Sequence, residues 1–218
     1  MQKRYFLGIS TVGLIVALLN SASANATLFN NDKVIQLGTV TLKVTQVSPG
    51  INTQIIYGST LNLKAGEYVL NPTTAPKTWA FCVDLDHVMN LNQTYTYELW
   101  LAYGRAGALL HLRDSFLTGS NLNKKGAAFQ VALWEIAHDH SLGNSIDLNT
   151  GAFQYTADAT VKSYANSLLS ATSGQADYYY FLRSTSGAQN LAMVPEPASM
   201  LALATGVVGL IARRRKNR

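Results

Sequence analysis

Alternation of apolar and polar residues predicts the first strand of the chain. Between Val34 and Val47, apolar Val40, Leu42 and Val44 alternate with polar residues, the period of two that is typical of a half-buried strand. Ser48-Pro49-Gly50 then predicts a turn. By the same pattern, further strands are expected at Thr53–Tyr57, Glu67–Leu70, Thr78–Leu85, Thr94–Tyr97, Asp177–Ser184 and Asn190–Val194.

The middle of the chain has the spacing of helices instead. Apolar residues recur at helical intervals in Glu98–Leu117, Gly126–His138 and Ala157–Ala171, and Asp158 stands near the start of the third segment, where a helix cap is expected. A few helices inserted among antiparallel strands favour the α+β class, as a sheet or sandwich-like module. Residues 25–189 are expected to form this single domain.

The first residues have the features of a secretory signal peptide. Lys3 and Arg4 give a basic start, Phe6–Leu19 is apolar, and Ala22-Ser23-Ala24 supplies the small residues that a signal peptidase accepts. The apolar run is shorter than the roughly 20 residues that a bilayer span needs. We therefore expect residues 1–24 to be removed by signal peptidase during export.

Residues 190–218 combine a proline motif, an apolar segment and a basic end. Pro195-Glu196-Pro197 precedes the apolar stretch Ala198–Ala212, and Arg213-Arg214-Arg215 follows it. The prolines disfavour helix, so an extended segment is expected before a membrane-seeking helix. The arginines would stay on the cytoplasmic side, which leaves the Pro-Glu-Pro segment outside.

This order resembles the PEP-CTERM sorting signal of Gram-negative, exopolysaccharide-producing bacteria. The resemblance implies recognition by an exosortase, removal of the hydrophobic tail, and release or attachment at the cell surface. It also implies a transient precursor anchored in the inner membrane through the C-terminal helix. A plain membrane anchor is the alternative, but it leaves Pro195-Glu196-Pro197 unexplained.

The positive net charge comes from the two ends of the chain. Seven of the 17 basic residues lie in the terminal clusters, so the chain between them carries ten basic and 12 acidic residues. It has no basic run that could follow a phosphate backbone. Nucleic acid is therefore not an expected partner.

Cys82 is the only cysteine, which excludes an internal disulfide in an exported protein. The thiol must then be buried, reactive or otherwise bonded. Around it, Trp79–Leu85 alternates as a strand does. Phe81 lies on one face of that strand, while Cys82 and Asp84 share the other.

Gln130 interrupts a helix that is apolar on nearly every side, from Ala127 to Ile136. Such a helix is buried, and a buried amide needs partners. One explanation is a thioester, formed when the Cys82 sulfur attacks the Gln130 carbonyl and ammonia leaves. The alternative is that Cys82 is a small buried apolar residue and that Gln130 hydrogen-bonds a neighbouring strand.

The two segments resemble the thioester domains of bacterial surface adhesins. In that family an aromatic-Cys strand motif faces a Gln-x-x-Φ-Trp helix motif, here Phe81-Cys82-Val83-Asp84 and Gln130-Val131-Ala132-Leu133-Trp134. The resemblance implies covalent adhesion through a Cys82–Gln130 cross-link, with Phe81, Asp84 and Trp134 around it. We expect a non-enzymatic surface or biofilm protein without cofactor or metal, whose partner is exopolysaccharide or a surface ligand.

Two other functions remain open from the sequence. A structural matrix protein could bind polysaccharide without a covalent bond, for instance by stacking sugars on Tyr178-Tyr179-Tyr180. A secreted hydrolase could pair Cys82 with a histidine that activates the thiol. The candidate histidines are His87, His111, His138 and His140. Asp84-x-Asp86-His87 and His138-Asp139-His140 contain metal-ligand types, but no zinc quartet can be assembled from them with one cysteine.

Overall fold

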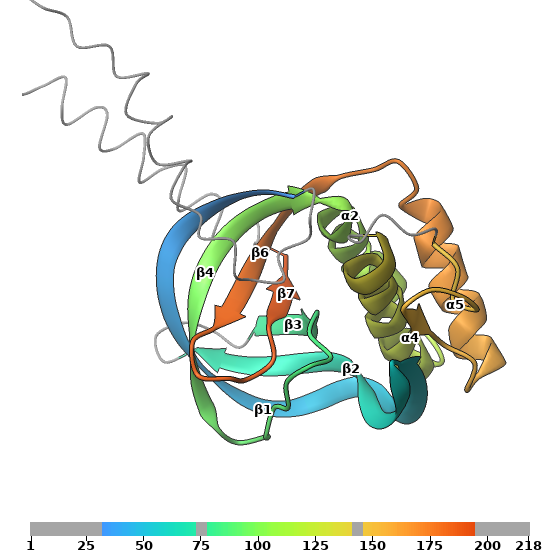
Figure 1. Cartoon of the computed structure of the whole chain (residues 1–218), viewed down its shortest axis with the longest axis horizontal. Coiled ribbons are helices and arrows are strands. Elements are labelled where there is room, and N and C mark those ends of the chain that lie inside the picture. Colours follow the sequence, from blue (N-terminus) through green and yellow to red (C-terminus); the bar gives the residue numbers. More distant parts are fainter. Residues whose placement is uncertain (1–31, 73–77, 141–145, 195–218) are drawn as a thin grey trace, which may run out of the picture.

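The computed structural model describes residues 32–72, 78–140 and 146–194. Figure 1 shows a strongly curved sheet with helices packed against one end of it. The sheet is antiparallel, so the predicted α+β class is confirmed. The expected signal peptide and C-terminal apolar helix lie outside the described residues.

The described elements follow one another along the chain in an order that groups most helices in the middle. They are β1 (Lys33–Tyr57), β2 (Ser59–Pro72), β3 (Thr78–Cys82), β4 (Thr94–Gly104), α2 (Arg105–His111), α3 (Arg113–Phe116), α4 (Leu122–Glu135), the π-helix η2 (Ile136–His140), β5 (Phe153–Gln154), α5 (Ala159–Ala171), β6 (Asp177–Ser184) and β7 (Leu191–Met193).

Strand β1 closes the sheet on itself. The strand order is β2-β3-β7-β6-β4-β1-β5, and β1 pairs with β2 as well. Its first part pairs with β4, from Lys33 opposite Tyr103 to Lys43 opposite Thr94. Its later part pairs with β2 as far as Tyr57 opposite Ser59. Because one long strand joins both edges, the sheet curves around a single core.

The turn expected at Ser48-Pro49-Gly50 is wrong, because the chain continues through it within β1. The irregularity appears instead as a register shift between Val47 and Gly50, as in a β-bulge. Gly50 lies opposite Gly66, and a Cβ on Gly66 would meet Cα of Gly50 at 2.6 Å. The two glycines therefore allow the strands to approach closely where β1 bends.

The helix expected over Glu98–Leu117 is wrong in its first part. Glu98–Gly104 belongs to β4, and helix begins only at Arg105. This segment hydrogen-bonds β1 on one side and β6 on the other. Pairing on both edges, together with aromatic and aliphatic residues suited to strands, outweighs the helical spacing.

The other two expected helices are confirmed as α4 with η2, and as α5. Asp158 caps α5, because its side chain accepts hydrogen bonds from the backbone N–H groups of Thr160 at 2.8 Å and Val161 at 3.0 Å. Helix α4 lies between the sheet and α5 (Figure 1). A Cβ at Gly126 would meet the carbonyl oxygen of Pro49 at 2.4 Å, so this glycine brings α4 against β1.

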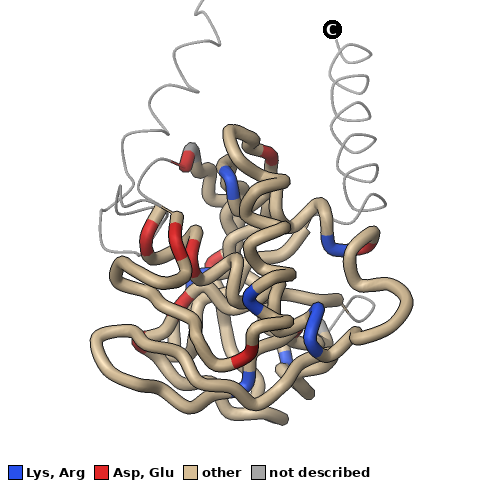
Figure 2. Tube along the Cα trace, turned by 90° about the vertical axis from the view of Figure 1, so that its right-hand side faces the viewer, with Lys and Arg blue, Asp and Glu red and all other residues tan. Residues whose placement is uncertain are grey.

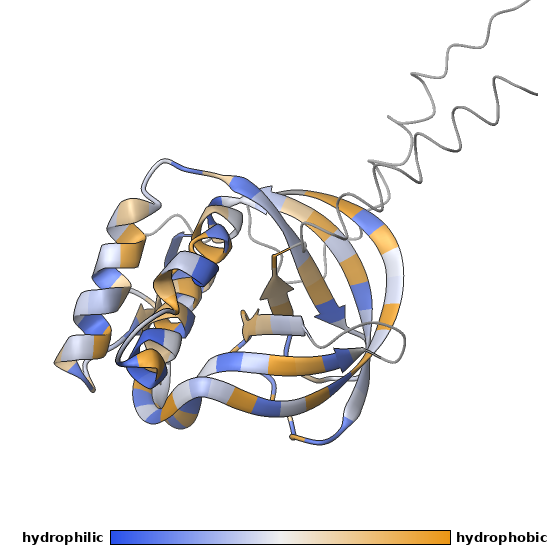
Figure 3. Cartoon of the chain, turned by 180° about the vertical axis from the view of Figure 1, so that it is seen from behind, coloured by the Kyte–Doolittle hydropathy of each residue, from blue (hydrophilic) through white to orange (hydrophobic). Residues whose placement is uncertain are grey.

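The core lies between the inner face of the curved sheet and α4. In Figure 3 hydrophobic and hydrophilic bands alternate along the strands, as the sequence pattern predicted. The largest fully buried side chains include Trp134, Tyr97, Tyr155, Tyr179, Phe81, Phe129, Phe153 and Phe181. Among the helices of residues 32–194 that are described, none has the length and apolar character needed to cross a membrane.

Candidate functional site

Cys82 and Gln130 meet in the centre of the core. The Gln130 side-chain oxygen accepts a hydrogen bond from the Cys82 backbone N–H at 2.9 Å, and the Gln130 amide donates to the Cys82 carbonyl at 2.6 Å. Both residues are fully buried. The carboxamide is therefore held against the residue that carries the sulfur, by two bonds from a single amide group.

The end of β3 creates the place that Gln130 fills. Strand β2 pairs with β3 only as far as Tyr68 opposite Ala80. Val83 donates its N–H to the Asn190 carbonyl, on the side of β7. Neighbouring residues of a strand direct their backbone polar groups to opposite edges, so the N–H and carbonyl of Cys82 face the edge from which β2 has already diverged. The Gln130 amide takes the place that a backbone peptide group would occupy, which satisfies the buried donor and acceptor.

The Cys82 thiol is a protonated, hydrogen-bonded group. Its sulfur donates to the Asp84 carbonyl at 2.8 Å and accepts from the Asp84 N–H at 3.3 Å. Burial raises the pKa of the Cys82 thiol to about 12, although the Asp84 backbone and the nearby Trp134 indole act in the lowering direction. The free thiol therefore carries no charge at neutral pH.

Aromatic side chains enclose the pair. Phe81 stacks on Phe129, the residue before Gln130, with ring centroids 4.6 Å apart. Trp134 is 1% exposed, and its indole nitrogen has no regular hydrogen-bond partner among the described residues. Buried aromatic rings therefore enclose the Gln130 carboxamide and the Cys82 thiol.

Asp84 has a different place from the one its strand pattern suggested, because β3 ends at Cys82. Its carboxylate is buried and accepts hydrogen bonds from His87 Nδ1 at 2.8 Å and from Asn190 Nδ2 at 3.0 Å. It also accepts from the backbone N–H groups of Asp86, His87 and Asn190. The carboxylate therefore fixes the chain just after Cys82 and orients His87, while only its backbone contacts the sulfur.

A cavity of about 370 Å³ opens beside this arrangement. Trp134, His87 and Gln189 contribute to its wall, together with Val47, Leu61, Asn62, Leu63, Lys64, Tyr68, Leu85, Val88, Met89 and Leu91. Gln189 donates to the Asp84 carbonyl at 3.3 Å, the same oxygen to which the sulfur donates, and accepts from the Tyr68 hydroxyl at 3.0 Å. The cavity therefore ends one hydrogen-bonded group away from the sulfur.

None of the four histidines hydrogen-bonds the Cys82 sulfur in the described part of the chain. His87 binds Asp84, and His111 Nδ1 is 2.9 Å from the Gly107 carbonyl oxygen. His138 is buried with Nε2 unpartnered among the described residues, and His140 is exposed. In the described residues the Cys82 thiol therefore hydrogen-bonds the Asp84 backbone rather than an imidazole.

The acidic and histidine motifs do not assemble a metal site in the described residues, where no group of three or more His, Cys, Asp or Glu side chains could hold an ion. Asp139 instead accepts the backbone N–H groups of Ala152 at 2.7 Å and Phe153 at 3.2 Å. Figure 2 shows the charged residues scattered over the fold, with acidic positions among the basic ones.

Of the cavity residues, the sequence pointed to Trp134 and His87 but not to Gln189 or Tyr68. The spacing of Asp84 and His87 was a usable signal, since three residues after a strand can form a turn in which the two side chains meet. Gln189 gave no such signal. Its contacts with Tyr68 and Asp84 span 121 and 105 residues of sequence, so they arise only from the closed sheet.

The comparison with protein families finds a match at the end of the chain. Residues 194–216 match the PEP-CTERM protein-sorting motif, directly after β7 ends at Met193. The matched range includes Pro195, Glu196, Pro197 and the arginines Arg213, Arg214 and Arg215, which lie outside the described residues. The motif indicates an exported, surface-associated protein that exosortase sorts through a membrane-anchored precursor. No curated protein and no solved structure matches the chain.

Proposed function

We propose that the domain is a surface-attachment module, in a Gram-negative-type envelope, that carries an internal thioester between Cys82 and Gln130. The observation that carries this proposal is the pair of hydrogen bonds that dock the Gln130 carboxamide on both backbone groups of Cys82 in a fully buried site. The adhesin resemblance of the two motifs agrees with it. Attachment would then follow from transfer of the Gln130 acyl group to a nucleophile on the target surface.

Thioester formation needs no reactant other than the Cys82 thiol and the Gln130 amide. The Cys82 sulfur attacks the side-chain carbonyl carbon of Gln130, a C–S bond forms, and the C–N bond breaks. The amide nitrogen leaves as ammonia and takes the thiol proton. The product is a neutral thioester, and the Cys82 and Asp84 carbonyls lose the amide and thiol donors that they have in the unreacted protein.

The surroundings suit a bond that must persist until a target arrives. Phe81, Phe129 and Trp134 are each at most 1% exposed, so bulk water has no direct path to the acyl carbon. The burial that raises the Cys82 pKa also makes the sulfur a poor leaving group as a thiolate. Hydrolysis is slow unless a proton is delivered to the sulfur.

Intact mass of the purified mature domain tests the proposal. The wild-type protein should be lighter than its sequence by one ammonia, and Cys82→Ala and Gln130→Ala should each restore the full mass. Methylamine should add to the wild-type protein and release a thiol that iodoacetamide then labels. Full mass in the wild type, with a thiol that is free without methylamine, would contradict the thioester.

The sorting part of the function has its own test. Deletion of Pro195–Pro197 should leave an uncleaved precursor in the membrane fraction, because exosortase recognition depends on this segment of the matched motif. A matched control is deletion of residues 118–120, which lie in the loop between α3 and α4. Normal processing of the Pro195–Pro197 deletion would contradict the assignment of the recognition segment.

A second candidate function, non-covalent binding of polysaccharide, is favoured by an exposed aromatic pair. Tyr103 and Tyr178 are paired across β4 and β6, with ring centroids 4.9 Å apart, and are 37% and 50% exposed. Exposed aromatic faces stack on sugar rings. Loss of glycan binding in Tyr103→Ala and Tyr178→Ala would support this function, provided that the difference between measured mass and sequence mass is the same as in the wild type. Unchanged glycan binding would exclude it.

A further inference from the structure

We infer that one end of the sheet rests on the membrane surface while the C-terminal segment anchors the precursor. This surface, the apolar rim, comprises Ile35 of β1, Leu101 and Tyr103 of β4, Tyr178 and Tyr180 of β6, and Met193 of β7. Its occupant is a lipid bilayer. The contact depends on the sorting motif and is independent of the proposed thioester.

Four neighbouring strands place one row of the apolar rim on the same side of the sheet. Ile35 lies opposite Leu101, which lies opposite Tyr180 on its other side. Tyr180 in turn lies opposite Met193. Residues that lie directly opposite one another in antiparallel strands have neighbouring side chains on one face. The row therefore runs without interruption from β1 to β7, and each of its side chains is at least partly exposed.

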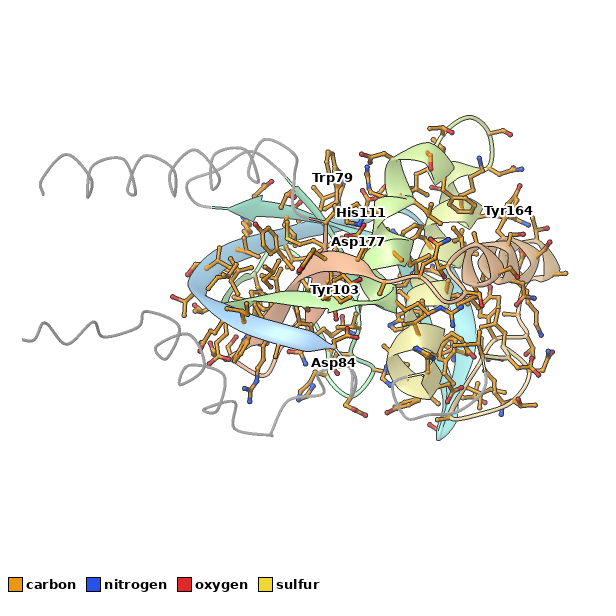
Figure 4. The ribbon with its side chains drawn as sticks, turned by 90° about the horizontal axis from the view of Figure 1, so that it is seen from above. Trp79, Asp84, Tyr103, His111, Tyr164 and Asp177 are labelled. Carbon is orange, nitrogen blue, oxygen red and sulfur yellow. The ribbon has the colours of Figure 1, made fainter. Side chains whose placement is uncertain are left out.

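At the apolar rim the core side of the sheet loses its cover. Residues two apart on β4 share a face, and on that face Tyr97 is fully buried, Leu101 is half-buried and Tyr103 is 37% exposed. Tyr103 stands near the end of the strand (Figure 4) and pairs with Tyr178, which is 50% exposed. The same apolar face thus passes from the core into solvent.

Exposed apolar side chains gather at this end of the sheet. Eight large apolar side chains are exposed among the described residues, and four of them are Ile35, Leu37, Tyr103 and Tyr178. A group of this kind marks a contact surface. Tyrosine suits a membrane interface, because its ring is apolar while its hydroxyl can stay in the hydrated headgroup layer.

The acidic residue next to the apolar rim does not belong to the same face. Asp177 precedes Tyr178 on β6, and successive side chains of a strand project to opposite faces. Its carboxylate lies 3.6 Å from His111 Nδ1. Asp177 is therefore directed toward a histidine rather than toward the lipid headgroups.

The length of chain between β7 and the apolar stretch limits how far the rim can lie from the bilayer. Met193 ends β7, the matched sorting motif begins at residue 194, and the apolar stretch begins at Ala198. The five steps from Met193 to Ala198 span at most about 18 Å even in a fully extended chain. Because Met193 is itself part of the apolar rim, anchoring of the precursor holds this end of the sheet close to the headgroup layer.

The contact is reversible by design of the chain. Stable attachment to a bilayer takes two signals, and a single weak one gives only marginal binding. The precursor has two, the C-terminal apolar stretch and the apolar rim. Loss of the apolar stretch leaves the rim alone, so the rim orients the anchored precursor on the membrane but does not hold a chain that lacks the anchor.

The experiment measures lipid contact in the anchored precursor, residues 25–218, in vesicles of phosphatidylethanolamine and phosphatidylglycerol. A fluorophore is attached to the cysteine introduced by Ile35→Cys, and a nitroxide-bearing lipid in the same vesicles is the quencher. Wild type is the labelling blank, since Cys82 is fully buried. Asn166→Cys is the matched control, because Asn166 is exposed on α5, which α4 separates from the sheet (Figure 1).

The fluorophore at position 35 should lose intensity to the nitroxide lipid, and the fluorophore at position 166 should not. Tyr178→Glu, which places a charge in the rim, should abolish the quenching at position 35. Leu122→Glu changes a residue of α4 that is 41% exposed, and it should leave that quenching unchanged. Thermal unfolding of both charged variants verifies that each is folded.

Every outcome bears on the membrane contact. Equal quenching at positions 35 and 166, or none at position 35, overturns it. Quenching at position 35 that persists in Tyr178→Glu overturns the role of the rim. Protection of position 35 from aqueous iodide without quenching by lipid assigns the rim to a second copy of the chain and overturns the lipid occupant. None of these results depends on whether the ammonia deficit of the thioester is found.

Discussion

The Gln130 side chain hydrogen-bonds the backbone N–H and the backbone carbonyl of Cys82, a residue 48 positions earlier in the chain. A single carboxamide thus satisfies a donor and an acceptor that the divergence of β2 leaves without a strand partner. In the unreacted fold both hydrogen bonds are present; the proposed cross-link would keep the carbonyl oxygen of Gln130 and lose its amide donor.

Gln130→Leu in a Cys82→Ala background should lower the free energy of unfolding by about 2–6 kcal/mol, because it leaves two buried backbone groups unpaired at about 1–3 kcal/mol each. The Cys82→Ala background removes any thioester, so the change measures the hydrogen bonds alone. Urea denaturation gives the value, and Gln175→Leu in the same background is an exposed control. A loss below about 0.5 kcal/mol would contradict the structural role of the amide.

Gly126→Ala should destabilise the fold, although alanine ordinarily stabilises a helix interior by about 1 kcal/mol relative to glycine. The added Cβ would lie 2.4 Å from the Pro49 carbonyl oxygen, so α4 must move away from β1. Overpacking of this kind costs about 1–3 kcal/mol. Thermal unfolding measures the sign, and a higher midpoint in the variant would show that α4 does not need this approach.

Arg113→Ala should lower stability by about 3–5 kcal/mol, because it leaves a buried carboxylate without its partner. Arg113 binds both oxygens of Glu67, at 2.7 and 2.8 Å, and Glu67 is 1% exposed. The control is Arg183→Ala, whose partly exposed pair with Glu98 spans 3.5 Å and should contribute less than about 1 kcal/mol. Equal losses in the two variants would contradict the difference in burial.

Glu135→Gln should change how stability depends on pH. Burial raises the pKa of Glu135 to about 7 from 4.5, so the folded state holds the proton more tightly than the unfolded state. Its contribution is therefore fully present below pH 4.5 and is lost as pH rises to about 7. The shift corresponds to about 3 kcal/mol.

The measurement is the difference in unfolding free energy between Glu135→Gln and wild type at several pH values. Asp32 also has a pKa raised by burial, to about 6, but it is present in both proteins and cancels in the difference. The variant should gain stability over wild type between pH 5 and pH 8. A difference that stays flat across this range would contradict the raised pKa.

The sequence pattern predicted the strands and helices that bury one face and expose the other. Asp177–Ser184 forms β6 as expected, and Asp158 caps α5, because period and cap are local properties. The pattern failed at Glu98–Gly104, where pairing with two distant strands decided the structure, and at Ser48-Pro49-Gly50, where β2 supports the bend. Neither cause is visible in a short window of sequence.

The candidate site also contains residues that were expected from the sequence and residues that were not. The proximity of Cys82 and Gln130 was expected from the resemblance of their two motifs, since spacing alone does not specify which residues meet. Gln189 and Tyr68 were missed because their contact joins β2 to the loop before β7. A site made by closure of a sheet is predictable only once the strand order is known.

Strand β7 has a mechanical consequence for a protein that is sorted through its C-terminal end. It lies between β3 and β6, pairs Leu191 with Cys82, and ends one residue before the matched sorting motif. Tension applied to the chain at Val194 therefore loads β7 in shear against its two neighbours and reaches the Cys82 strand directly. If a surface were attached through Gln130, force between it and the C-terminal end would pass mainly through β3 and β7. The other strands and helices would carry little of that force.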